Sequence, residues 1–167
     1  MDLVLPSSKC IQSYNEYIEE LGDEVRYPFP MGFDHQDFDA LLVKLSDFSL
    51  GINLPDGFVP STTLWLVEGD QLLGVTNLRH YLNNAIEECG GHIGLGIRPS
   101  YRGKGLGKLL MKLSIAKLNA MDVSAVHIHC YKDNSASANT IIANGGELSS
   151  ELALGDKVVH RYLVMSS

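Results

Sequence analysis

The run from Arg98 to Lys108, RPSYRGKGLGK, combines three glycines with four basic side chains. It follows a short apolar segment and precedes an amphipathic segment that favours a helix. A strand, a glycine-rich turn and a helix start direct several backbone N–H groups to one point, where the helix dipole adds positive charge. We therefore expect this run to bind a phosphate or pyrophosphate group.

The basic residues around this run have no acidic neighbours in sequence. From Cys89 to Met121 there are six Lys or Arg and no Asp or Glu, whereas the chain carries a formal net charge of −7. Removing these six positive charges leaves −13 on the other residues. This acidic balance argues against nucleic acid as the main partner and favours the approach of a cationic small molecule such as an amine.

Length and composition predict one globular domain spanning residues 1–167, with 45% hydrophobic and 20% charged residues. No apolar run approaches the roughly 18 residues that a membrane span needs, and no signal pattern opens the chain, so we expect a cytoplasmic protein without membrane partners. The three cysteines form no CxxC pattern, and no spacing of ligands predicts a metal site.

Hydrophobic periodicity and Gly or Pro punctuation outline the elements that must position the loop. We expect helices over 8–21, 34–48, 82–88, 106–120 and 135–144. We expect strands over 3–5, 62–67, 71–78, 92–97, 125–130, 147–154 and 157–164. Hairpins combined with a strand–helix–strand crossover predict a mixed sheet covered by helices, an α/β (α+β) domain. The helix over 106–120 is expected to bury Leu106, Leu109, Leu110, Leu113 and Ala116.

Two common phosphate-binding patterns fit the loop poorly. A P-loop requires Ser or Thr after its Gly-Lys, but Lys108 is followed by Leu109. A dinucleotide fold requires an acid about 20 residues further on, whereas the next strand ends in Cys130-Tyr131-Lys132. A nucleotide-binding module remains a weaker alternative.

The segment Arg102 to Gly107 fits the acyl-CoA signature Arg/Gln-x-x-Gly-x-Gly/Ala and resembles the GNAT superfamily of acetyl-CoA-dependent N-acetyltransferases. The resemblance continues through 95–99, 131–137 and 144–146, and covers about 62–164. The segment from Arg79-His80 to Gly91-His92 is similar to an uncharacterised bacterial subgroup of predicted acetyltransferases, which names no substrate.

The resemblance implies a GNAT-like, mostly antiparallel sheet of six to seven strands, flanked by helices and splayed between the strands near 92–97 and 125–130. Residues 1–60 would form the variable acceptor side and residues 61–167 the acetyl-CoA-binding core. In such a site the pantetheine arm contacts the strand at Leu95, Gly96 and Ile97, and the Ile97 N–H stabilises the thioester oxygen. The pyrophosphate and the thiol end would contact Arg102, Gly103, Lys104, Gly105, Leu106, Gly107, Lys108, Asn134 and Ser137.

Acetyl transfer needs a neutral amine, and a weak acid can protonate the departing thiolate. The resemblance places the usual catalytic Tyr at Ile141, so that acid is missing; Tyr131 and Tyr162 are the remaining phenols in this half of the chain, and packing roles are expected for both. Base candidates are Glu87, Glu88, His80, His92, His127 and His129. We favour Glu88 and His92 among them, and we expect Ser137 to contact a water or the thiol.

These observations predict an acetyltransferase that moves acetyl from acetyl-CoA, as co-substrate, to a primary amine of a small molecule or peptide. No cysteine has a nucleophile setting, so direct attack in a ternary complex is expected. A non-catalytic acyl-CoA-binding or sensing module is the alternative. The acceptor and the oligomeric state stay open, a homodimer included.

Overall fold

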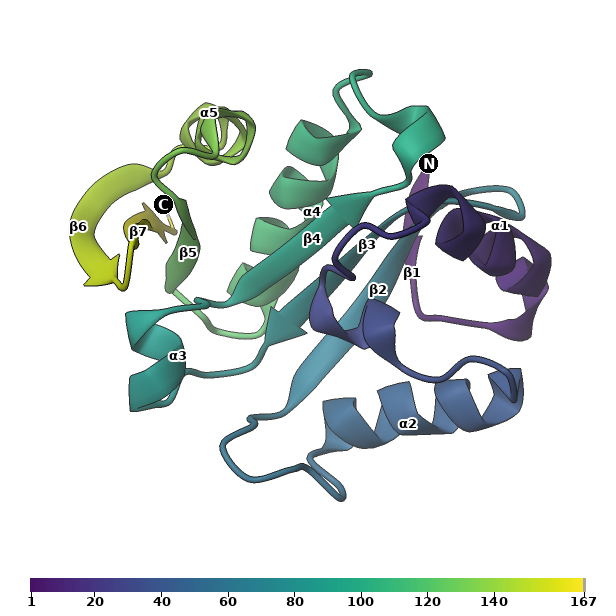
Figure 1. Cartoon of the computed structure of the whole chain (residues 1–167). Coiled ribbons are helices and arrows are strands. Elements are labelled where there is room, and N and C mark those ends of the chain that lie inside the picture. The colour runs from purple at the N-terminus through teal and green to yellow at the C-terminus, as the bar shows by residue number, and fades with distance from the viewer. Residues whose placement is uncertain (167) are drawn as a thin grey trace.

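The central hairpin of the molecule joins β2 (Ser61–Glu68) to β3 (Gln71–Arg79) around Gly69, whose φ of +60° suits glycine in the turn. In the computed structural model, which describes residues 1–166, β1 (Asp2–Val4) pairs with β2 and β4 (Ile93–Ile97) pairs with β3. The four strands form one antiparallel sheet in the order β1-β2-β3-β4 (Figure 1).

A second sheet contains the last three strands. β5 (Ala125–Tyr131) pairs with β7 (Lys157–Met165), which pairs with β6 (Glu147–Leu154), both antiparallel. Between β4 and β5 there is an isolated bridge from Gly91 to Ile128, and the two strands then diverge (Figure 1). The predicted architecture of seven mostly antiparallel strands with a splay is confirmed, and the splay divides the strands into two sheets.

Alternation along β2 sends its side chains into separate cores on the two faces of the first sheet. Trp65 and Val67 pack with α1 (Ile11–Leu21) and α2 (Phe38–Leu50). Leu64 and Leu66 face the other side, where α4 (Leu106–Ala120) packs with α5 (Ser135–Ala143) and β5. The short α3 (Asn84–Glu88) links β3 to β4 beside the base of the splay (Figure 1).

The first two helices begin later than their apolar patterns predict. A 3-10 turn, η1 (Ser8–Cys10), precedes α1, and a second, η2 (Phe29–Gly32), lies in the loop before α2. The helix predicted from Asp34 starts at Phe38, because Asp37 caps it by accepting the Ala40 N–H at 3.1 Å. The Asp34 carboxylate instead accepts the Gln36 N–H and closes a turn.

The buried face of α4 is rotated from the predicted one. Leu106 and Leu110 are buried as expected, but Leu109 and Leu113 are half-buried and Ala116 is exposed. Met111, Ser114 and Leu118 are buried in their place. The prediction assumed one partner surface, whereas α4 crosses below the splay and contacts β3, β4, β5 and α5.

Candidate active site

The glycine loop precedes α4 and follows a 3-10 turn, η3 (Pro99–Tyr101). Gly103 and Gly105 have φ angles of +75° and +80°, a conformation that favours glycine. Gly105 is the N-cap of α4 and no side chain caps this helix, so its first N–H groups remain available. A Cβ atom added at either glycine would meet nothing within 4 Å. The loop thus leaves open space beside backbone donors, which suits an anionic group.

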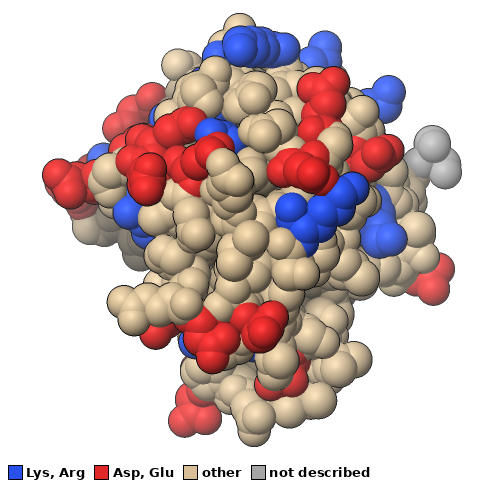
Figure 2. Space-filling model, turned by 90° about the vertical axis from the view of Figure 1, so that its right-hand side faces the viewer, with Lys and Arg blue, Asp and Glu red and all other residues tan. Residues whose placement is uncertain are grey.

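The cations of this region have acidic neighbours in space, although they have none in sequence. Arg98 is buried and pairs with Glu16 at 3.1 Å and Glu20 at 2.8 Å, both on α1. Arg102 is exposed and pairs with Glu24 at 3.0 Å. Figure 2 shows acidic side chains beside basic ones on the face that carries α1 and α2. The interpretation of Arg98 as part of a free cationic cluster was therefore wrong: its charge ties α1 to the end of β4.

The backbone of β4 presents Leu95 and Ile97 to the splay. His92 O accepts from Arg79 N, and Arg98 N donates to Leu73 O. The backbone groups of the even-numbered residues from His92 to Arg98 therefore face β3. Since backbone groups alternate along a strand, the N–H and C=O groups of Leu95 and Ile97 face away from β3. The Ile97 carbonyl also accepts from Arg102 Nε at 3.0 Å. This arrangement gives the predicted pantetheine contacts a free strand edge.

Gly96 and Gly94 lie directly against the loop that carries Tyr27. A Cβ at Gly96 would lie 2.6 Å from the Tyr27 carbonyl oxygen, and one at Gly94 would lie 3.2 Å from the Tyr27 hydroxyl. The loop before η2 therefore crosses directly over β4. Leu106 is also buried, so its backbone N–H is the group left for a ligand.

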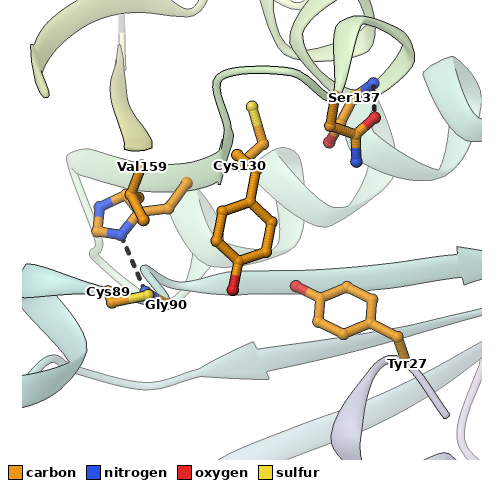
Figure 3. A pocket seen from close by; sticks show the side chains of 9 residues that line it. Tyr27, Cys89, Gly90, Cys130, Ser137 and Val159 are labelled. Atoms are coloured by element: carbon orange, nitrogen blue, oxygen red, sulfur yellow. Dashed lines mark hydrogen bonds between the residues drawn. The ribbon is translucent and has the colours of Figure 1, made fainter. Parts of the chain in front are cut away.

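Backbone and imidazole groups close the base of the splay. His92 N–H donates to His127 O at 2.7 Å, and His127 N–H donates to His92 Nδ1 at 2.9 Å. Gly90 N–H donates to His129 Nδ1 at 3.0 Å (Figure 3). Burial, with a smaller contribution from neighbouring His127, lowers the pKa of His92 and of His129 to about 4. This pKa makes both imidazoles weak bases, and the lone pair of each Nδ1 already accepts a backbone N–H, which argues against His92 or His129 as the base.

The other base candidates lie outside the main cavity. His80 Nε2 is 2.7 Å from Thr62 Oγ1, and burial lowers the pKa of its imidazole. Glu88 is exposed on α3, and Glu87 lines a separate hollow with His127 and Arg161. No Asp or Glu is among the residues that line this cavity, which lies at the end of β5.

The main cavity, of about 300 Å³, lies at the end of β5 beside the start of α5. Its walls are formed by Tyr27, Cys89, Gly90, His129, Cys130, Tyr131, Asn134, Ser137 and Val159 (Figure 3). Asn134 caps α5 by accepting the Ser137 N–H at 3.1 Å, so the cavity wall brings these two predicted residues together. Ile141, at the usual Tyr position, is fully buried in the core.

Two phenols reach this cavity, and the sequence reasoning missed one of them. Tyr27 extends from the loop before η2 with its hydroxyl directed into the cavity (Figure 3), and burial raises the pKa of that hydroxyl. Tyr131 enters from β5. Tyr162 is buried in the core, where it packs against apolar side chains. A protonated phenol at Tyr27 can donate a hydrogen bond at neutral pH.

Residues 1–166 contain neither a metal-binding group of side chains nor a membrane-spanning helix. No group of three or more His, Cys, Asp or Glu side chains within that range is arranged to hold a metal ion. Across the same residues, no helix has the length and apolar character needed to cross a membrane.

Comparisons with known proteins agree with this geometry. The ribosomal-protein-S5-alanine acetyltransferase from Vibrio fischeri has a TM-score of 0.72 at 15% identity, covering 98% of this chain and 91% of that one. The ribosomal L7/L12 alpha-N-protein acetyltransferase RimL, in complex with coenzyme A, gives 0.70 at 12%, covering 98% and 92%. The microcin C7 self-immunity acetyltransferase MccE, in complex with acetyl-CoA and AMP, gives 0.70 at 15%, covering 98% and 91%.

No curated protein matches the sequence significantly, and at such identities the solved structures show the fold alone. The family model described as the acetyltransferase (GNAT) family matches residues 17–141, well over half of the chain. This span includes the C-terminal part of α1, the splay, the glycine loop and α5 as far as Ile141. The chain therefore belongs to the GNAT family of acetyltransferases.

Proposed function

We propose that this protein transfers acetyl from acetyl-CoA to a primary amine of a small molecule or peptide by direct attack in a ternary complex. The observation that carries the proposal is the combination of three features. They are the uncapped start of α4, the edge of β4 that does not pair with β3, and the cavity lined by Asn134 and Ser137. We assign the pyrophosphate to the start of α4, the pantetheine arm to the edge of β4 and the thioester to the divergence between β4 and β5.

The backbone carries most of the proposed binding. N–H groups from Gly103 to Lys108 would hold the pyrophosphate, with Lys104 and Lys108 exposed beside them. Leu95 and Ile97 would bond the pantetheine amides as an added strand does. The Ile97 N–H would bond the thioester oxygen, which gains negative charge as the amine attacks.

Proton transfer in the proposed mechanism depends on few side chains. No carboxylate lines the cavity and two imidazoles have occupied Nδ1 atoms, so we infer that the amine loses its proton to water. Tyr27 is the proposed donor to the departing thiolate, in place of the Tyr missing at Ile141. A thiol pKa near 8.5 makes this assistance modest.

The lack of a carboxylate base also favours one alternative, an acyl-CoA-binding or sensing module without catalysis. Release of free thiol from acetyl-CoA with a panel of amines separates the two functions. The enzyme must release thiol with at least one amine. The sensing module would bind acetyl-CoA, raise the melting temperature and release no thiol with any of them.

A further inference from the structure

Arg79, the last residue of β3, has no acidic partner among residues 1–166. Its Nη1 donates to Gly91 O at 2.8 Å, and its Cζ lies 5.9 Å from the centroid of the Phe29 ring. Burial lowers the pKa of this guanidinium, so water compensates its charge poorly. By contrast, buried Arg98 has two carboxylates. A half-buried cation without a counter-charge is unfavourable unless a ligand supplies one.

The position of Arg79 links it to the active site. It lines a hollow of about 140 Å³ with apolar side chains that include Phe29, Phe58 and Ile86. A Cβ at Gly90 would lie 3.4 Å from Arg79 Nη1, and Gly90 also lines the main cavity. The thickness of one glycine backbone therefore separates the guanidinium from the proposed site of acetyl transfer.

The charges of the two hollows indicate which acceptors fit. Within the part of the chain that the structure describes, neither hollow has an Asp or Glu in its wall. A polyamine or an aminosugar would carry additional ammonium groups past Arg79 without a carboxylate to receive them. An acceptor with one amine and one carboxylate would complement this site instead.

We propose that Arg79 binds the carboxylate of the acceptor, and that the acceptor is a free amino acid with an apolar side chain. The planar guanidinium suits a carboxylate, and Phe29 and Phe58 provide the apolar wall for the side chain. The amine nitrogen attacks the acetyl carbon, the carbon–sulfur bond breaks, and the amine proton leaves for solvent or the thiolate. The products are an N-acetyl amino acid and coenzyme A. This inference rests on the proposed acetyltransferase function.

The test compares L-leucine and L-phenylalanine with leucinamide and phenylalaninamide, which lack the carboxylate, and with the polyamine spermidine. Thiol release from acetyl-CoA is measured for the full-length wild type and for Arg79→Gln, Arg79→Lys and Lys117→Gln. Lys117→Gln is the matched control, because it removes one exposed positive charge from α4. Thermal shifts with acetyl-CoA verify that each variant folds and binds the donor.

We expect the wild type to acetylate at least one of the two amino acids with kcat/KM at least tenfold above that of its amide. Arg79→Gln should lower this kcat/KM roughly 30-fold, as loss of a charged hydrogen bond does, and leave the amide within about twofold. Arg79→Lys should lie between them, and Lys117→Gln should match the wild type.

Equal use of acid and amide by the wild type would overturn the inference, and this comparison stands even if Arg79→Gln fails to fold. An equal loss for acid and amide in Arg79→Gln would assign Arg79 to holding Gly91. Acetylation of spermidine, but of neither amino acid, would contradict the carboxylate site and leave the acetyltransferase function intact. Silence toward every amine would contradict both.

Discussion

His92 and His127 exchange two hydrogen bonds, one from backbone to backbone and one from the His127 N–H to the His92 imidazole. The ring nitrogen occupies the place of a strand carbonyl and ties the start of β4 to β5. Immediately beyond this pair the strands diverge, and the proposed thioester site lies within that divergence. The histidine favoured as a base thus has a structural place at the base of the splay.

This arrangement predicts a loss of stability in mild acid. His92 and His129 have folded-state pKa values of about 4, below the value of about 6.5 expected in the unfolded chain. As the pH falls, the unfolded state therefore binds protons on these two histidines before the folded state does. The contribution to stability is complete above pH 6.5 and is lost as the pH falls towards 4, by roughly 3 kcal/mol for each histidine. Chemical denaturation at several pH values measures the slope of the free energy of unfolding against pH.

Asparagine provides the matched control, because its side-chain oxygen can replace Nδ1 without titrating. His92→Asn combined with His129→Asn should flatten the slope between pH 4 and 6.5. His92→Ala leaves the His127 N–H unpaired and should cost about 1–3 kcal/mol at every pH. If the double Asn variant retained the slope of the wild type, the origin of the acid sensitivity would lie elsewhere.

Gly107→Leu separates ligand contact from folding. Gly107 lies in the first turn of α4 without a positive φ, and an added Cβ would lie 3.9 Å from Ile97 Cγ1. Leucine should stabilise the helix by about 0.5–1 kcal/mol through its helix propensity, whereas its side chain is larger than the glycine or alanine of the acyl-CoA signature and should obstruct the pyrophosphate. We expect a melting temperature at least equal to that of the wild type together with at least tenfold weaker coenzyme A binding by calorimetry.

Gly107→Ala is the matched control, since the signature accepts alanine at this position and the added Cβ would lie at an ordinary 3.9 Å from Ile97 Cγ1. Its coenzyme A affinity should equal that of the wild type. Unchanged affinity in Gly107→Leu would refute the close approach of the ligand to the start of α4. Gly105 is a poorer choice, because its φ of +80° would strain any alanine.

The Arg102–Glu24 pair predicts opposite effects from its two members. Coenzyme A must compete with Glu24 for the guanidinium, and the pair is exposed, so it is weak. Arg102→Ala should weaken binding about tenfold at low salt, and Glu24→Gln should tighten it about twofold. Both effects should shrink as salt increases. Glu19→Gln, which neutralises an exposed acid on α1 shortly before Glu24, should change little; a salt-independent loss in Arg102→Ala would exclude a phosphate contact.

Tyr27→Phe tests the phenol in the cavity. If Tyr27 protonates the thiolate, kcat should fall about tenfold while KM for acetyl-CoA stays constant, because the thiol is already a good leaving group. Steady-state kinetics for Tyr27→Phe, Tyr131→Phe and Tyr162→Phe identify which phenol acts. A larger decrease in Tyr131→Phe than in Tyr27→Phe would transfer the role to β5.

The chain's periodicity predicted every strand and most helix ends to within two residues, because the hairpins have clear Gly turns and alternating strands. Asn134 and Ser137 were predicted together from the family resemblance, and the structure places them together because Asn134 caps α5 by accepting the Ser137 N–H. The loop motif likewise located the start of α4.

The sequence did not predict contacts between residues that lie far apart in the chain. No residue near Arg98 indicates that it pairs with Glu16 and Glu20, which lie about 80 positions earlier. Tyr27 reaches the cavity because Gly94 and Gly96 let its loop cross β4, a relationship between segments almost 70 residues apart. The spacing of Gly94 and Gly96 was the available signal in the sequence.

The central claim is that acetyl-CoA binds along α4 and β4 and gives its acetyl group to an amine. Thiol release from acetyl-CoA, measured with a broad panel of amines for the wild type and Gly107→Leu, tests it most directly. We expect amine-dependent release by the wild type, and release at subsaturating acetyl-CoA at least tenfold lower in a well-folded Gly107→Leu. Absence of release with every amine, or equal release by the variant, would contradict it.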